Sequence, residues 1–443
     1  MSLIEPRTLK GFRDYLPETM IPRERLMETA RGVYRSFGFS PIDTPALEYA
    51  EILVGKGGEE SDKQLYRFTD HGGRDVALRF DLTVPLARFV AQYHHDLGLP
   101  FKRYHIGPVW RGENTQRGRY REFVQCDFDT IGVESVTADI EAVLVVHQLF
   151  RALGFERFQI RVNNRKLLNG LLASLDLAER SAPILRVLDK LPKVGEAKVA
   201  EELIGSVGLD GARAKAVIAI ASIQGSNAQI LSALEPMAHG ERGQQGLMDL
   251  RAVLEGARAA GVPEACLQLD PSIARGLDYY TGTIFETFLG DLPGIGSVCS
   301  GGRYDNLAQL YTKERLPGIG GSLGLDRLLA AMEELKMLPS TRTPVRVMLA
   351  YFDAQHLTDY LRLAAQLRGA GIGVEFYPEP KKLGQQLKYA DKRGFDYALI
   401  LGGNEWAAGV CQLKELKTGA TRELKIAGPQ GELSSELAAA LKG

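Results

Sequence analysis

Basic side chains are concentrated between residues 102 and 121, in the segment KRYHIGPVWRGENTQRGRYR. This segment has one acidic residue, Glu113, and its six basic residues are Lys102, Arg103, Arg111, Arg117, Arg119 and Arg121. We predict two strands that flank a polar loop, and strand residues of like parity share one face of a sheet. Guanidinium groups on such a face suit phosphate oxygens, although a solvated basic hairpin has the same composition.

A second polar cluster lies in residues 274–288, ARGLDYYTGTIFETF. Arg275, Asp278, Tyr279 and Tyr280 fall within six residues, beside two glycines. A buried arginine needs an anionic partner or ligand, and tyrosine hydroxyls can orient a polar ring by hydrogen bonding. The alternative is an amphipathic strand edge with stacked aromatic rings.

Carboxylates and glycines supply further candidates. Asp81 lies in LRFDLTVP, while Asp127 and Asp129 lie two residues apart in QCDFD, a spacing that places both on one face of a strand. Such a pair could bind a metal, an amine or an imidazolium. Residues 300–328 contain SGGRYDNL and GIGGSLGLDRL. A glycine-rich run into a helix can hold an anion, whereas tight packing of helix on sheet explains the same glycines.

One short motif points elsewhere. HIGP, at 105–108, resembles half of the HIGH motif of class I synthetases. That motif opens a helix in a parallel-sheet fold, whereas here it lies in a strand pattern and no KMSKS-like sequence follows. We therefore interpret it as the interior of a strand.

The elements that position these residues have recognisable patterns. Residues 22–37 have the apolar spacing of an amphipathic helix, and 138–152 read as a buried helix. Between 74 and 136, three closely spaced segments rich in β-branched and aromatic residues predict an antiparallel sheet. Residues of about 165–262 contain no convincing strand pattern and predict a helical insertion, and strand character returns at 266–290.

A change of composition at 339–345, PSTRTPV, marks a linker. Beyond it, apolar strands alternate with helices, which predicts a small α/β domain with a largely parallel sheet. We therefore expect an α+β domain over 1–338, with an antiparallel sheet flanked by helices and a helical insertion, followed by an α/β domain over 344–443.

Bulk composition excludes several classes of protein. With 443 residues the chain is too long for one ordinary core, and its formal net charge of −1 argues against binding nucleic acid by charge alone. Cys126, Cys266, Cys299 and Cys411 are far apart and show no zinc spacing, so we expect free thiols and no protein metal site. Without a signal peptide or a membrane-length apolar run, we expect a cytoplasmic protein with no membrane partner.

Taken in order, these segments resemble a class II aminoacyl-tRNA synthetase over nearly the whole chain, and most closely the histidyl-tRNA synthetase family. GFSPIDTPALE resembles motif 1, RYHIGPVWRGENTQRGRYREFVQCDFDTIG motif 2, and GIGGSLGLDRL motif 3. RGLDYYTGTIFE resembles a segment peculiar to histidyl enzymes and is highly specific, whereas motifs 1 and 3 are loose patterns. KKLGQQLKYADKRGFDYALILGG and LKTG resemble the family's anticodon-binding domain.

The resemblance implies an ATP-binding half of the site. Arg111 would hold the α-phosphate of ATP, and Arg275 would contact it from the other side, so that both are catalytic. Phe123 and Arg327 would sandwich the adenine, a stack with cation–π character. Glu113 would be an acid on the ATP side, and Mg2+ would accompany the phosphates.

The resemblance also implies a histidine-binding half. Asp81 would hold the ammonium group with help from Gln125, and Asp129 with Tyr280 would read the imidazole. The full set that the resemblance implies is Asp81, Thr83, Gln125, Asp129, Arg275, Tyr279 and Tyr280.

The implied activity is ATP-dependent ligation of L-histidine to its tRNA through a histidyl-adenylate, by a homodimer that forms through motif 1. Two alternatives stay open. A non-catalytic paralogue that regulates histidine biosynthesis usually lacks the C-terminal domain and has a degraded RGLDYY segment, whereas this chain has both. A class II ligase for another amino acid, such as proline or threonine, would lack RGLDYYTG and the acid–tyrosine pair.

Some positions depart from the bacterial pattern of the family. Bacterial members commonly have Pro-Glu where this chain has Phe80-Asp81, and Glu where it has Asp129. The sequences RFDLTVPLAR and YREFVQCDFD are more similar to those of the eukaryotic and archaeal branch. Which tRNA identity elements the chain uses therefore stays open.

Overall fold

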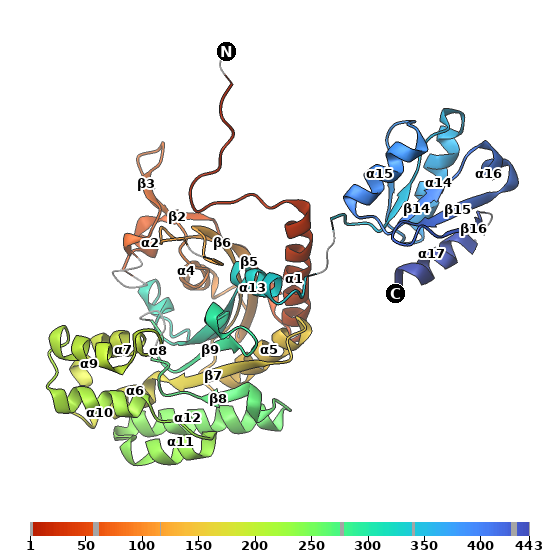
Figure 1. The fold of residues 1–443 in the computed structure, drawn as a ribbon. Helices are drawn as coiled ribbons and strands as arrows, with labels where there is room; N and C mark the ends of the chain where they lie inside the picture. Colours follow the sequence, from red (N-terminus) through yellow and green to blue (C-terminus); the bar gives the residue numbers. More distant parts are fainter. Residues whose placement is uncertain are drawn as a thin grey trace. The chain divides into compact units, whose positions relative to one another are not determined.

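The chain forms two compact units in a computed structural model, which describes residues 3–55, 62–115, 117–274, 279–338, 342–426 and 432–442. One unit contains residues 1–13 and 25–337, and the other contains 14–24 and 338–443 (Figure 1). Part of the predicted linker lies outside the described residues, so the domain limits of 1–338 and 344–443 stay a prediction.

The first unit is built on an eight-stranded sheet, which confirms the predicted antiparallel sheet. Only its edge pairs, β1 with β5 and β7 with β8, are parallel. In spatial order the strands are β1 (Ser40–Pro41), β5 (Phe101–Trp110), β6 (Glu122–Ile131), β11 (Gly318–Gly324), β10 (Cys299–Tyr304), β9 (Thr283–Leu289), β7 (Phe158–Asn164) and β8 (Leu267–Leu269).

Helices cover the sheet where its residues are apolar. The two helices predicted near 22–37 and 138–152 are α1 (Pro17–Ser36) and α5 (Thr137–Ala152). The Tyr34 hydroxyl of α1 donates to the Cys126 carbonyl of β6 at 2.9 Å, and its ring lies 5.4 Å from that of Phe128. α13 (Leu325–Glu334) follows β11 directly. Even-numbered residues of β6 therefore face this apolar layer, which leaves the odd-numbered ones for the opposite face.

The strand-like region 74–136 contains a helix that the sequence analysis did not predict, α4 (Thr83–Tyr93). α4 buries Val84, Leu86, Ala87 and Val90 on one side, so the apolar run that suggested a strand is a helical face. Beside it lie α2 (Ala50–Leu53) and a small antiparallel sheet of β2 (Leu47–Tyr49), β4 (Asp75–Leu78) and β3 (Arg67–Thr69).

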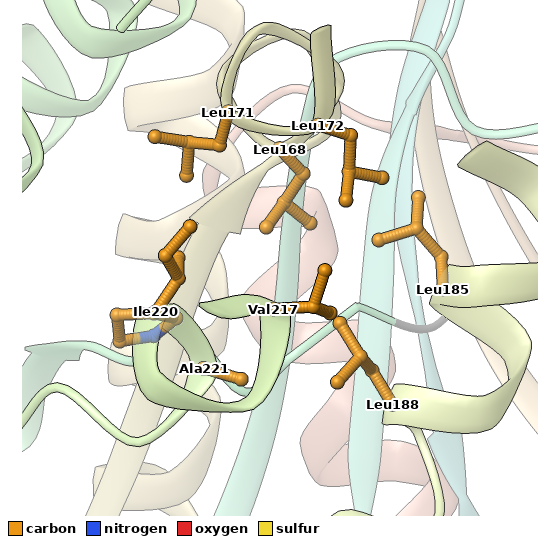
Figure 2. A pocket seen from close by; sticks show the side chains of 9 residues that line it. Leu168, Leu171, Leu172, Leu185, Leu188, Val217, Ile220 and Ala221 are labelled. Carbon is orange, nitrogen blue, oxygen red and sulfur yellow. The ribbon is translucent and has the colours of Figure 1, made fainter. Parts of the chain in front are cut away.

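The insertion at 165–262 is helical throughout its described length, as predicted, and its helices gather at one end of the first unit (Figure 1). They are α6 (Arg165–Ala173), α7 (Ser181–Leu188), α8 (Leu191–Val194), α9 (Glu196–Gly205), α10 (Gly211–Ala221), α11 (Asn227–Leu234) and α12 (Gly240–Ala259). Leu168, Leu185 and Val217 help to line an apolar pocket between α6, α7 and α10 (Figure 2). Its lining consists of hydrophobic side chains, so we assign it to the core of the insertion.

The second unit contains a five-stranded sheet in the order β13-β12-β14-β15-β16. β12 pairs in parallel with β13 and β14, whereas β15 and β16 add an antiparallel edge, so the expected parallel sheet holds for three strands. The strands are β12 (Val347–Leu349), β13 (Val374–Phe376), β14 (Tyr397–Ile400), β15 (Val410–Glu415) and β16 (Thr421–Lys425). The helices are α14 (Leu357–Gly369), α15 (Leu383–Arg393), α16 (Gly403–Ala408) and α17 (Glu432–Lys442).

Candidate active site

The odd-numbered residues of β5 and β6 form one polar sheet face. In the register of the two strands, Arg103 is opposite Asp129, His105 opposite Asp127 and Gly107 opposite Gln125. Burial of these charged residues is nearly complete, since Arg103 is 0% and Asp127 1% exposed. Buried charges are found where they are paired or meet a ligand, so this face is the candidate site.

The basic segment does not form a single phosphate platform. Lys102 lies on the other face and contacts Glu141 of α5 at 2.6 Å, and Arg103 pairs with Asp129 at 2.7 Å. In the loop, Arg117 pairs with Glu334 at 2.8 Å, and Arg119 lies 3.8 Å from Glu113. Strand parity and local ion pairs therefore place these basic residues on different faces and beside different acidic partners.

Arg111 lies at the end of β5 among aromatic rings. Its Nε donates to the Phe80 carbonyl at 3.1 Å, and its guanidinium lies 4.2 Å from the Phe80 ring centroid and 5.1 Å from that of Phe123. The carbonyl bond and the two rings fix the guanidinium plane. Sequence analysis assigned Arg111 and Phe123 to one ATP site, and the structure brings the two together.

α13 is joined to the same part of β6 by Asp326. One carboxylate oxygen accepts from the backbone N–H of Val124 and the other from Arg13, both at 2.9 Å. This anchors the start of α13, including Arg327, beside the strand that carries Phe123. Arg327 in turn donates to the Ser297 carbonyl. Phe123 and Arg327 are the two residues predicted to enclose the adenine. The hydrogen bond between Val124 and Asp326 therefore holds Arg327 beside the strand that contains Phe123.

Asp81 lies at the start of α4, where helix N–H groups lack partners within the helix. Its Oδ1 accepts from the backbone N–H of Val84 at 2.9 Å and from that of Thr83 at 3.2 Å. Burial raises the pKa of Asp81, and those N–H groups and the guanidinium of Arg111 oppose the rise. The carboxylate is therefore fixed by the backbone while lying close to the charged sheet face.

Gln125 and Asp127 have hydrogen-bonding capacity left over. Gln125 donates to the Ser322 hydroxyl at 2.8 Å, while its Oε1 is buried with no hydrogen-bond partner among the described residues. The Oδ1 of Asp127 is likewise buried and without such a partner in the described part of the chain. Burial raises the pKa of Asp127 to about 7, with the charge of Arg103 acting against it. Unmatched buried acceptors of this kind suit a ligand that brings N–H donors.

Asp129 occupies the centre of an acid–tyrosine cluster. It accepts a hydrogen bond from the Tyr304 hydroxyl, and burial raises its pKa to about 6 while Arg103 opposes the rise. The pKa of Tyr280 is raised by burial and then by the negative charges of Asp129, Asp127 and Asp81. Tyr280 is therefore close enough to the three carboxylates to sense their charge, as the predicted pairing with Asp129 requires.

The remaining predicted residues divide between described and undescribed parts. Tyr279 packs against Tyr280 with ring centroids 5.0 Å apart. Arg275 and Asp278 lie outside the described residues. Sequence reasoning missed Tyr304, although its place in SGGRYDNL, two residues after a pair of glycines, was a usable signal.

No group of three or more His, Cys, Asp or Glu side chains in the described ranges is arranged to hold a metal ion. Likewise, none of the described helices combines the length and apolar character that crossing a membrane requires.

Two family models match the chain. One, described as histidyl-tRNA synthetase, covers residues 11–328, and the other, an anticodon-binding domain, covers residues 345–435. The first spans the eight-stranded sheet and the helical insertion, and the second spans most of the C-terminal α/β unit.

Curated relatives and solved structures agree with these matches. A histidine–tRNA ligase of Rhodopirellula baltica is 61% identical over 95% of this chain and 96% of its own length, and one of Wolinella succinogenes is 47% identical over 94% and 95%. A crystal structure of histidyl-tRNA synthetase from Nostoc sp. superimposes with a TM-score of 0.88 at 35% identity, covering 99% of this chain and 100% of that one. These names favour the ligase over the non-catalytic regulator. Both curated relatives are bacterial, so the expected nearness to the eukaryotic and archaeal branch is not supported.

Proposed function

The chain belongs to the histidyl-tRNA synthetase family, and from this premise we propose how its buried polar face divides the work of the reaction. The activity is the ATP-dependent ligation of L-histidine to tRNA. In the first step the histidine carboxylate attacks the α-phosphorus of ATP and pyrophosphate leaves. In the second step the terminal ribose hydroxyl of the tRNA attacks the acyl carbon and AMP leaves. Positioning and charge stabilisation carry such steps without a covalent bond to the protein.

In this proposal the ATP half lies around Arg111. Its guanidinium is already oriented by Phe80 and Phe123, so it is prepared to hold the α-phosphate with little loss of side-chain entropy. Phe123 and Arg327 enclose the adenine, and Arg275 is assigned to the opposite side of the α-phosphate by the RGLDYY match alone. Mg2+ usually binds phosphate oxygens with only one or two carboxylates, which is compatible with Glu113 as the sole nearby acid of the loop.

The histidine half uses the buried acceptors. Asp81 and the unpartnered Oε1 of Gln125 accept from the ammonium group, while Asp129 and Tyr280 take the imidazole ring. Thr83 beside Asp81 and Tyr279 beside Tyr280 complete the wall. Because these polar groups would be left unpaired by an apolar ring, the pocket rejects phenylalanine and leucine more strongly than shape alone would allow.

The observation that carries this assignment is the burial of three carboxylates, Asp81, Asp127 and Asp129, at 4%, 1% and 3% exposure, beside Arg103, which lies 2.7 Å from Asp129. A buried excess of carboxylates is stable only with cations nearby, and Arg103 beside Asp129 and Arg111 near Asp81 supply two charges against three. The ammonium group of the amino acid supplies another. The negative charge on this side of the pocket therefore favours binding of the ammonium group of an amino acid over binding of a phosphate.

Pyrophosphate exchange tests the substrate directly. Each amino acid is offered separately with ATP and labelled pyrophosphate, and exchange with histidine alone is expected. Exchange with proline or threonine would point to another class II ligase, and no exchange with any amino acid would point to the regulatory paralogue.

The homodimer and the cytoplasmic location are also proposals. Three large apolar side chains of the small sheet are unusually exposed, Tyr49 at 51%, Phe68 at 47% and Leu47 at 39%. Tyr49 and Phe68 both lie opposite Val76, so they share one face of that sheet. An isologous contact through this face would bury it, and β2 overlaps the end of the segment that resembles motif 1, residues 38–48.

A further inference from the structure

Arg103 is among the largest fully buried side chains of the described residues and lies in the middle of the polar face. One terminal nitrogen, Nη2, lies 2.7 Å from Asp129 Oδ2 and donates to the Leu82 carbonyl at 3.3 Å. Leu82 directly follows Asp81, and Asp129 is assigned to the imidazole. A single guanidinium nitrogen therefore contacts both walls of the histidine half, the strand β6 and the start of α4.

The charged groups around Arg103 come from several elements. β6 contributes Asp127 and Asp129, the start of α4 contributes Asp81, and β5 contributes His105. Burial, together with the positive charges of Arg103 and Arg79, lowers the pKa of His105 to about 3, so this histidine is neutral. Tyr280 and Tyr304 complete the surroundings, and the pKa of each is raised by burial, so both stay neutral. Arg103 is thus the cation that acts on all three carboxyl groups, while Arg111 also acts on Asp81 and Arg79 also acts on Asp127.

We propose that Arg103 is a positioning residue of the histidine site, which keeps Asp129 ionised and holds its carboxylate in place for the imidazole. This inference rests on the proposed role of Asp129. It replaces the sequence-based expectation that Arg103 belongs to a phosphate-binding platform, because this guanidinium has no exposed surface and its Nη2 is paired with a carboxylate at 2.7 Å.

The physical reason is the cost of an unpaired buried charge. Without Arg103, the carboxylate of Asp129 loses its cation and takes up a proton near neutral pH. A protonated carboxyl group is a poorer acceptor for a ring N–H, and Tyr304 alone does not set its charge. At higher pH Asp129 loses that proton again. The loss of histidine binding is therefore largest at low pH and becomes smaller as the pH rises above the raised pKa of Asp129.

The test is the histidine KM of Arg103→Met relative to wild type, measured by pyrophosphate exchange from pH 6 to 8.5. Taking the ratio cancels the titration of free histidine. We expect a roughly 10–100-fold increase at low pH, as for one lost charge-assisted bond, and a smaller ratio at high pH. The ATP KM should change little. Arg103→Lys keeps the charge, so its ratio should be flat across the pH range.

Lys102→Met is the matched control, because it removes one cation from the adjacent position while acting on the opposite face, where Lys102 contacts Glu141. It should leave the pH dependence unchanged. If Arg103→Met is too unstable to assay, the double variant with Asp129→Asn removes both charges and should have the histidine KM of Asp129→Asn alone. A ratio that does not depend on pH, or a rise confined to the ATP KM, would overturn the inference. If Asp129→Asn itself leaves the histidine KM unchanged, it is the proposed role of Asp129 that fails.

Discussion

Gly320 lies directly opposite Asp129 in the pairing of β11 with β6, and a Cβ atom on it would come within 2.1 Å of Asp129 Oδ1. The glycine-rich run GIGGSLG is therefore a strand in the centre of the sheet, and its missing side chain provides the space for the carboxylate. The suggestion of an anion-binding loop before a helix is replaced by close packing of backbone against a functional side chain.

Gly320→Ala is expected to displace the Asp129 carboxylate from Arg103 and Tyr304. Overpacking of this kind costs roughly 1–3 kcal/mol of unfolding free energy. Because the displaced group is assigned to the imidazole, we also expect the histidine KM to rise about tenfold or more while the ATP KM stays close to wild type. Gly324→Ala, whose Cβ would meet nothing closer than 3.7 Å, is the matched control for thermal denaturation and kinetics. Equal histidine KM values in the two variants would contradict the steric argument.

The imidazole assignment makes its own prediction through Tyr280. Tyr280→Phe removes one hydroxyl and keeps the partly buried ring, so an expected loss of about 1–3 kcal/mol in histidine binding reports the lost hydrogen bond. Asp129→Asn should cost more if the bound ring is cationic. Both effects should appear in the histidine KM and in calorimetric binding of histidine. If only the ATP KM rises, the RGLDYY segment should be assigned to the ATP-binding half of the site instead.

Strand parity explains why the sequence located the site but not its internal pairing. Arg103 and Lys102 look alike in a basic segment, yet one is buried against Asp129 and the other contacts α5. The register of β5 with β6 determines which carboxylate Arg103 contacts and which Lys102 contacts. That register is set by contacts between segments that are distant in the sequence. Tyr304 was missed for the same reason, since 175 residues separate it from its partner Asp129.

Two elements were missed because their local composition indicated another structure. Glycine is unfavourable in strands, so the composition of 318–324 did not indicate the strand β11, and its neighbours β6 and β10 explain why small residues are needed there. α4 begins Thr-Val-Pro, a β-rich start in which the proline occupies the first turn, where its missing N–H costs nothing. The long helices could be predicted because their periodicities extend over many residues, and the antiparallel sheet because its strand segments are close together in the sequence.

Arg275 is predicted to stabilise charge that develops on the α-phosphate. Arg275→Ala should reduce the rate of pyrophosphate exchange roughly 10²–10³-fold, as for the loss of one transition-state donor. Histidine binding in the absence of ATP should change far less, which calorimetry can measure. Unaltered exchange kinetics would assign a structural role to this residue.

The proposed homodimer can be tested at the exposed face of the small sheet. Sedimentation of the wild-type chain at micromolar concentration is expected to give twice the chain mass of 48.6 kDa. Replacing Tyr49 and Phe68 with lysine should weaken the association because charged side chains are costly in the core of an interface. Ile204→Lys in the insertion, also an exposed apolar position at 46%, is the matched control and should stay dimeric. A wild-type chain that is active as a monomer would refute the proposal.

The C-terminal unit is expected to act on tRNA rather than on histidine activation. A chain that ends near Ser340 keeps every residue assigned to ATP and histidine, so pyrophosphate exchange should persist while charging of tRNA falls steeply.

Exposed basic residues on and beside α15, among them Lys382, Lys388 and Lys392, provide a milder test in the full-length chain. Changing these three lysines to glutamine should weaken tRNA binding and reduce its dependence on salt, because fewer phosphate contacts release fewer counterions. Replacing Lys190, Lys193 and Lys198 of the insertion in the same way removes an equal charge from another part of the chain and separates local from general electrostatic effects. If the truncated chain charges tRNA at full efficiency and the α15 variant binds it as wild type does, residues 344–443 serve another purpose.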